Sequence, residues 1–219
     1  MKNLIISALF LSSILFSSCA TQRTQSVLEE TGRIIERAEQ YNAAEYAPYQ
    51  LSKAKGNVNS ARQMLGRRRK KKALESAESA LNEAKEAFRL ASRSSAAVAL
   101  KNARGSLKLV RRNKAHENNE ELHRKLSKSV KTAEEKFMAD NMDRSYDASM
   151  DAAHYADALL EPLRKEASIK IKKVQNKMRE EEMDNPRLQN RLRDAKSAAE
   201  KQNYHRALNI LDKILNQTK

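Results

Sequence analysis

The sequence predicts an all-α protein, built as an elongated array of three long antiparallel helical hairpins, and three observations carry this prediction. The 219 residues include only 4 Gly and 3 Pro, too few for the many turns of a β-sandwich or barrel. Ala, Lys, Glu, Arg and Leu dominate the composition, which is typical of long packed helices. Small and apolar residues recur at steps of three and four along most of the chain, the spacing of one helix face.

The chain opens with a segment typical of a secretory signal. Lys2 supplies a positive charge, and an uncharged, mostly apolar run of 13 residues extends from Leu4 to Phe16. That run is too short to span a bilayer as a helix and suits the apolar region of a signal peptide. An uncleaved anchor is the alternative that this segment leaves open.

A single cysteine follows the apolar run, in the order Phe16-Ser17-Ser18-Cys19. Small residues before a lone cysteine resemble a bacterial lipobox, although Phe16 departs from the usual aliphatic residue, a departure that spirochaete lipoproteins tolerate. The resemblance implies a lipoprotein signal peptide over 1–18 and acyl chains on Cys19, enough for stable membrane attachment. A plain secretory signal with an incidental cysteine is the alternative. One cysteine excludes an internal disulfide framework and cysteine-based zinc sites.

The residues after Cys19 divide into four predicted segments. Residues 19–45 form the lipidated N-terminus and an amphipathic helix, whose apolar face is predicted to contain Val27, Ile34, Ile35 and Ala38. Residues 46–115, 116–184 and 185–219 form the three hairpins. The residues Ala20-Thr21-Gln22-Arg23 contain no acid, which resembles the default sorting of diderm lipoproteins to the outer membrane and leaves the periplasmic or surface face open.

The three hairpins are predicted because one pattern occurs three times. Each copy has a small residue late in one helix and another small residue 12 positions later, with the turn near Arg69, Asn141 or Asn203. Small residues at these positions let two helices approach closely, while larger apolar residues fill the spread ends. We call these residues the repeat anchors; they are Ala61 paired with Ala73, Ala133 paired with Ser145, and Ala195 paired with Ala207.

The ends of the hairpin arms carry local signals. Pro48 fits the first turn of a helix, Gly66 fits a C-terminal stop, and Asn185-Pro186 reads as a cap followed by a first-turn proline. Two arms are predicted to be very long, over 70–112 and 143–183, and Pro162 is predicted to kink the second or restart its helix.

Two resemblances accompany the hairpins. Asn203-Tyr204-x-x-Ala207-Leu208 resembles the turn of tetratricopeptide repeats, so the hairpins are identified as TPR-like, and also coiled-coil-like in arm length. Tyr46-Ala47-Pro48-Tyr49-Gln50-Leu51-x-x-Ala54 resembles the Y-A-P-x-E-L-x-x-A opening of an uncharacterised family of bacterial lipoproteins. That second resemblance covers roughly residues 44–91 and implies a fold and a location but no activity.

Side chains that could carry chemistry do not converge in the sequence. Glu120-x-x-His123 and Asp151-x-x-His154 have the spacing of metal sites in helix bundles. His123 shares the inner face of its arm, whereas His154 points to the opposite side of the next arm, so we expect neither a metal nor another cofactor. No serine stands in a nucleophile elbow, and the sequence favours a protein that is not an enzyme.

Basic residues outnumber acidic ones by 43 to 28, and the formal charge is +15. Two groups stand out, a turn that we call the basic tip and a helix face that we call the basic stripe. The tip consists of Arg67, Arg68, Arg69, Lys70, Lys71 and Lys72, and the stripe of Arg89, Arg93, Lys101, Arg104, Lys108 and Arg111. They are candidate binding surfaces for anionic lipid, lipopolysaccharide or acidic glycan; a merely solvated face is the alternative. Export and few aromatic residues argue against nucleic acid.

These observations together predict a non-enzymatic lipoprotein of the bacterial cell envelope, held by its N-terminal lipid. Its hairpins would serve as a helical-repeat scaffold for contacts with another envelope protein. The alternative function is an electrostatic tether that binds anionic lipid or glycan through its basic residues.

Overall fold

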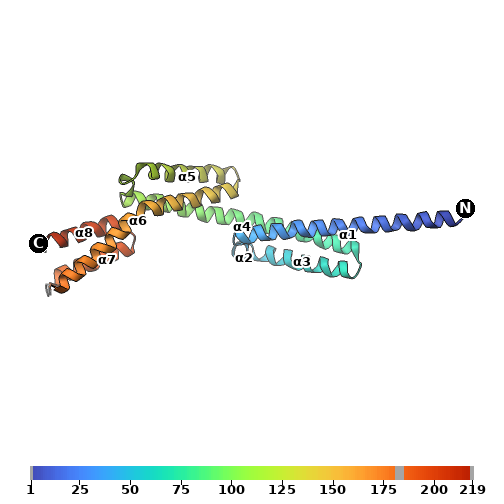
Figure 1. Ribbon diagram of the computed structural model, residues 1–219, viewed down its shortest axis with the longest axis horizontal. Helices are drawn as coiled ribbons and strands as arrows, with labels where there is room; N and C mark the ends of the chain where they lie inside the picture. Colours follow the sequence, from blue (N-terminus) through green and yellow to red (C-terminus); the bar gives the residue numbers. More distant parts are fainter. Residues whose placement is uncertain (1, 181–184, 218–219) are drawn as a thin grey trace. The chain divides into compact units, whose positions relative to one another are not determined.

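The computed structural model describes the backbone of residues 2–180 and 185–217, and the side chains of residues 21–180 and 185–217. Over these residues the chain is helical and has no strand, so the all-α prediction is confirmed. The helices, labelled in Figure 1, are α1 (Lys2–Gln40), α2 (Ala43–Tyr46), α3 (Pro48–Gly66), α4 (Lys70–Arg112), the short 3₁₀ helix η1 (Ala115–Glu117), α5 (Glu120–Met138), α6 (Met142–Glu180), α7 (Pro186–Glu200) and α8 (Tyr204–Gln217).

The chain divides into two compact units, an N-terminal unit (Met1–Ser95) and a C-terminal unit (Ala96–Lys219). The division falls within α4, and therefore within the segment 46–115 that the sequence assigns to one hairpin. The physical reason is that the second part of α4 packs with later helices. Leu100 of α4 forms a buried cluster with Ala133 of α5 and Ala148 of α6.

In the N-terminal unit, α1 and the first part of α4 run parallel. Arg23 Nη2 lies 3.0 Å from Glu78 Oε1, and Lys85 Nζ lies 3.2 Å from Glu30 Oε1. In both ion pairs the α4 residue follows the α1 residue by 55 positions. Because this difference stays constant as the numbers rise, the two helices advance in the same direction.

Helix α3 lies against the same part of α4 in the opposite direction. Asn57 Nδ2 donates to Ser79 Oγ at 3.0 Å, and the ammonium of Lys53 pairs with the carboxylate of Glu83. Here the α4 number rises by four as the α3 number falls by four, which defines an antiparallel pair.

The face that α1 buries matches the predicted one only at Ala38. Thr24, Thr31 and Ala38, spaced seven residues apart, have no exposed surface, whereas Val27, Ile34 and Ile35 are half-buried. Small side chains let α1 approach the alanine-rich face of α4 closely, and the larger apolar residues then flank the contact. Thr31 can be buried because its hydroxyl donates to the Val27 carbonyl at 2.7 Å.

Three turns share one backbone geometry, between α3 and α4, between α5 and α6, and between α7 and α8. In each turn one residue, Arg68, Asp140 or Gln202, has a left-handed backbone with φ of 55–56°. The next amide donates to the carbonyl five positions back, which defines a Schellman ending. These bonds are Arg69 N to Met64 O at 2.9 Å, Asn141 N to Lys136 O at 2.9 Å and Asn203 N to Ala198 O at 2.8 Å.

The helix ends lie where the local signals predict them. Pro48 is the first residue of α3, and Asn185 Oδ1 caps α7 by accepting from Arg187 N at 3.0 Å. Gly66 is the last residue of α3, but the left-handed residue of this turn is Arg68. The chain therefore does not use the conformational freedom of glycine here.

In the C-terminal unit, α6 packs against α5 and α8, and α7 against α8. The predicted restart at Pro162 does not occur, because α6 continues through this residue. Proline removes the bond to the carbonyl four positions back, that of Ala158. Ala158 is exposed, so water can reach the carbonyl and the helix tolerates the loss.

Candidate functional site

The predicted lipid attachment point lies on α1. The backbone of Cys19 is part of this helix, but its side chain lies outside the described residues, so acylation remains a prediction. Folded contacts begin shortly afterwards, with Arg23 paired to Glu78 and Thr24 fully buried. Among the described residues, no helix has the length and apolar character needed to cross a membrane.

The basic tip lies on the turn between α3 and α4 and on the first residues of α4. Five of its six residues are exposed, and Lys70 is half-buried. Among the described residues, no carboxylate lies within ion-pairing distance of these five. They are Arg67, Arg68, Arg69, Lys71 and Lys72. The structure therefore brings together five solvated cations at one end of the α3–α4 pair.

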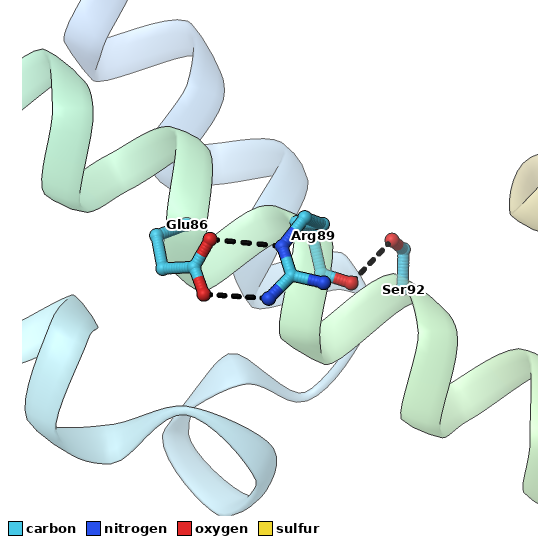
Figure 2. A network of polar contacts seen from close by, with 3 residues as sticks. All are labelled: Glu86, Arg89 and Ser92. Carbon is cyan, nitrogen blue, oxygen red and sulfur yellow. Dashed lines mark hydrogen bonds and ion pairs between the residues drawn. The ribbon is translucent and has the colours of Figure 1, made fainter.

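The basic stripe is partly neutralised by acids. Figure 2 shows Arg89 bound to Glu86 through two hydrogen bonds, Nε to Oε2 at 2.8 Å and Nη2 to Oε1 at 2.7 Å. These bonds from Arg89 are the main cause of a lowered pKa at Glu86. In the C-terminal unit, Arg104 Nε donates to Glu134 Oε1 of α5 at 2.7 Å.

The remaining stripe residues are exposed: Arg93 in the N-terminal unit, and Lys101, Lys108 and Arg111 in the C-terminal unit. Arg93 also takes part in a polar interaction. The i, i+3 spacing of Glu86 and Arg89 could have revealed the first pair from the sequence. Glu134 could not have been found this way, because it belongs to another helix.

The repeat anchors are all buried, without any exposed surface. They are Ala61, Ala73, Ala133, Ser145, Ala195 and Ala207. The anchor pairs flank the three Schellman turns, which have the same 72- and 62-residue spacings as the anchors. The sequence pattern therefore marks positions where two helices meet beside a turn.

The anchor pairs are divided between the two units of the chain. Ala61 of α3 and Ala73 of α4 lie in the N-terminal unit, whereas the other two pairs lie in the C-terminal unit. Ala73 is in the first turn of α4, where its amide donates to the Arg69 carbonyl at 3.0 Å. In the α5–α6 pair the anchors are joined directly, since Ser145 Oγ donates to the Ala133 carbonyl at 2.8 Å. A serine hydroxyl that reaches the backbone of the facing helix requires the two helices to lie close together.

A histidine pair joins η1 to α5. The rings of His116 and His123 lie 5.2 Å apart between centroids. Within the described part of the chain, His116 Nδ1 and His123 Nε2 are buried without a hydrogen-bond partner. Burial, followed by the nearby charge of His116, lowers the pKa of His123 below 6.5. Sequence reasoning compared His123 with His154 and found no convergence. It did not place His116 beside His123, because the intervening turn breaks helical spacing.

No metal-binding constellation is found among the described residues, meaning no group of three or more His, Cys, Asp or Glu side chains placed to hold an ion. His154 instead lies beside Tyr155, with ring centroids 6.0 Å apart. The two predicted i, i+3 motifs therefore do not come together in one site.

The C-terminal unit has an open groove where α6 meets the α7–α8 pair. Its volume is about 330 Å³, and its apolar lining includes Ala167, Ile171, Ala199 and Tyr204. Arg164 lies at the same groove and pairs with Asp157 at 2.6 Å. A groove of this kind offers apolar contact surface with a charged margin.

Compared with known proteins, the chain matches no family model, no curated protein and no solved structure. The lipobox before Cys19 and the opening over Tyr46–Ala54 therefore remain sequence resemblances, and the site predictions built on them remain predictions. What the structure adds is the placement of each candidate. The anchors are buried, the stripe is partly paired and the tip is exposed.

Proposed function

We propose that this protein is a non-enzymatic lipoprotein of the bacterial cell envelope that serves as a helical-repeat scaffold for another envelope protein. In this proposal residues 1–18 are removed, Cys19 carries the lipid, and the outer membrane is the destination. The α3–α4, α5–α6 and α7–α8 pairs act as three TPR-like hairpins.

The observation that supports the scaffold is the threefold turn with its buried anchors. A repeated helix pair generates similar neighbouring faces, and arrays of this kind present extended surfaces to partner proteins. The groove lined by Ile171 and Tyr204 is one such surface in the C-terminal unit. It combines apolar lining with a charged margin, which suits a protein partner.

The alternative function, an electrostatic tether, draws support from the basic tip. Arg89 and Arg104 of the stripe already have carboxylate partners within the chain. Their capacity to attract an external anion is reduced accordingly. Among the residues that the structure describes, five tip residues have no such partner, so the tether proposal applies to the tip.

Lipid attachment is tested with a Cys19→Ser variant of the full chain. Wild-type protein should stay in the membrane fraction after a high-salt wash, and the variant should not, since acyl chains provide attachment that salt does not screen. Ser17→Ala, which keeps the cysteine, is the matched control. A Cys19→Ser variant that remains with the salt-washed membranes would refute lipid anchoring.

The scaffold is tested by crosslinking in the intact envelope followed by mass spectrometry. Crosslinks from the C-terminal unit to one envelope protein should persist at high ionic strength, because apolar contacts are not screened by salt. Their loss at high salt favours the tether. Crosslinks to lipid alone, in samples where other envelope proteins crosslink to each other, contradict the scaffold.

A further inference from the structure

The register of α1 on α4 places the predicted lipid attachment point beside the basic tip. Two ion pairs fix α1 and α4 as parallel helices with a constant difference of 55 positions. Helix α1 is continuous from Lys2 to Gln40, so the same difference applied to Cys19 reaches Leu74. Figure 1 shows α1 extending past the turn between α3 and α4.

The separation along the helix axis follows from helix geometry. Lys70 and Lys72 precede Leu74 by four and two residues, which corresponds to about 3–6 Å at a rise of 1.5 Å per residue. The cations of the tip and a lipid on Cys19 would therefore face the same membrane surface at close range.

We propose that the basic tip binds the phosphate groups of anionic phospholipids in the leaflet that holds the acyl chains of Cys19. This inference rests on the proposed lipid attachment and goes beyond it, because it assigns a lipid class and an orientation. The N-terminal unit then sits with its α3–α4 turn on the membrane and with α2, at the other end of α3, away from it.

The polypeptide segment between Cys19 and the folded unit is short, which strengthens the contact of the basic tip with the membrane. Arg23 follows Cys19 by four positions and is the first described residue of α1 with an ion pair to α4. Even fully extended, this segment would span at most about 14 Å. The tip is thus held near the headgroups at high effective concentration.

The expected strength follows from the number of cations. Each Lys or Arg near an anionic leaflet strengthens binding roughly fivefold. Reversing three tip residues, Arg69→Glu, Lys71→Glu and Lys72→Glu, should therefore lower the preference for anionic over neutral vesicles by at least roughly 100-fold. The substitutions at Lys71 and Lys72, in the first turn of α4, place negative charges that interact favourably with the helix N-terminus, so the variant should fold.

A matched control carries the same change in net charge elsewhere. Lys128→Glu, Lys172→Glu and Lys173→Glu reverse three cations of the C-terminal unit. The full chain, purified with its lipid, is mixed with two vesicle populations, one of phosphatidylcholine and one of phosphatidylcholine with phosphatidylglycerol. The measured quantity is the amount of protein bound to the anionic vesicles divided by the amount bound to the neutral vesicles. The acyl chains contribute equally to binding of both populations, so they do not change this ratio.

The proposal expects the ratio to fall in the tip variant and to stay near the wild-type value in the control. An unchanged ratio in the tip variant, or an equal fall in both variants, overturns it. Mass spectrometry of Cys19 in the same samples reports separately on the proposed function. If the measured mass shows no acyl chains on Cys19, lipid anchoring is contradicted. The ratio of binding between the two vesicle populations still tests whether the basic tip binds anionic lipid.

Discussion

Enlarging the anchor Ala133 should destabilise the C-terminal unit. Its side chain has no exposed surface, and its carbonyl accepts the Ser145 hydroxyl at 2.8 Å. Leucine at this position must find room for three more carbon atoms in a contact that already brings the backbone of α5 within hydrogen-bonding distance of a side chain on α6. Either α5 and α6 move apart or neighbouring side chains leave their preferred rotamers.

The magnitude can be worked out from the two parts of this contact. Overpacking of a buried position costs about 1–3 kcal/mol, and separation of the helices would break the Ser145 bond, which contributes about 1 kcal/mol. The free energy of unfolding should fall by about 2–4 kcal/mol. For a unit the size of residues 96–219, this corresponds to a loss of about 10 °C in Tm.

Thermal unfolding followed by circular dichroism measures the change, with Ala158→Leu as the control. Ala158 is an exposed alanine of α6, and its replacement adds the same atoms where they have space. The control should shift the free energy of unfolding by no more than about 0.5 kcal/mol. If Ala133→Leu were as mild as Ala158→Leu, the close approach at the anchors would be refuted.

Three further predictions concern pH, capping and orientation. Stability should fall between pH 7 and pH 5, because burial and then His116 hold the pKa of His123 below 6.5, so the unfolded chain takes up the proton first. Urea titrations should show this dependence weakened in His123→Leu, and an unchanged slope contradicts the assignment. Arg69→Asn should raise the free energy of unfolding by about 1 kcal/mol by supplying a cap to α4, measurable by the same titrations; a loss of stability contradicts it. A fluorophore on Gly66→Cys in the lipidated chain should be quenched by headgroup-labelled lipid more strongly than one on Glu45→Cys, and equal quenching contradicts the orientation.

The positions of the helices could be predicted because small-residue periodicity is a local property. The predicted arm over 70–112 coincides with α4, and the three predicted turns lie beside the left-handed residues Arg68, Asp140 and Gln202. The identity of the left-handed residue could not be predicted. Sequence rules assign such positions to glycine, since other residues incur a backbone cost of about 1–2 kcal/mol, and here the surrounding fold overrides that preference.

Contacts between helices were the part that local pattern could not supply. The buried face of α1 contains Thr24 and Thr31, which a count of apolar residues assigns to the surface. Thr31 satisfies its own hydroxyl within the helix, so it packs like a small apolar residue. The pairing of Arg104 with Glu134 likewise depends on the register of α4 against α5, which no spacing within one helix encodes.

The three Schellman turns also bear on how the chain folds. Each turn joins helices that are neighbours in sequence, and the contact between Ala133 and Ser145 spans 12 residues. Contacts of such short sequence separation need little loop closure, which favours rapid folding. A chain that is synthesised N-terminus first can thus pair each of these arms with the one before it. Contacts between distant segments must wait. The seating of α1 on α4 needs the chain to about residue 95, and the hydrogen bond from Asn113 Nδ2 to the Gln202 carbonyl needs it to about residue 202.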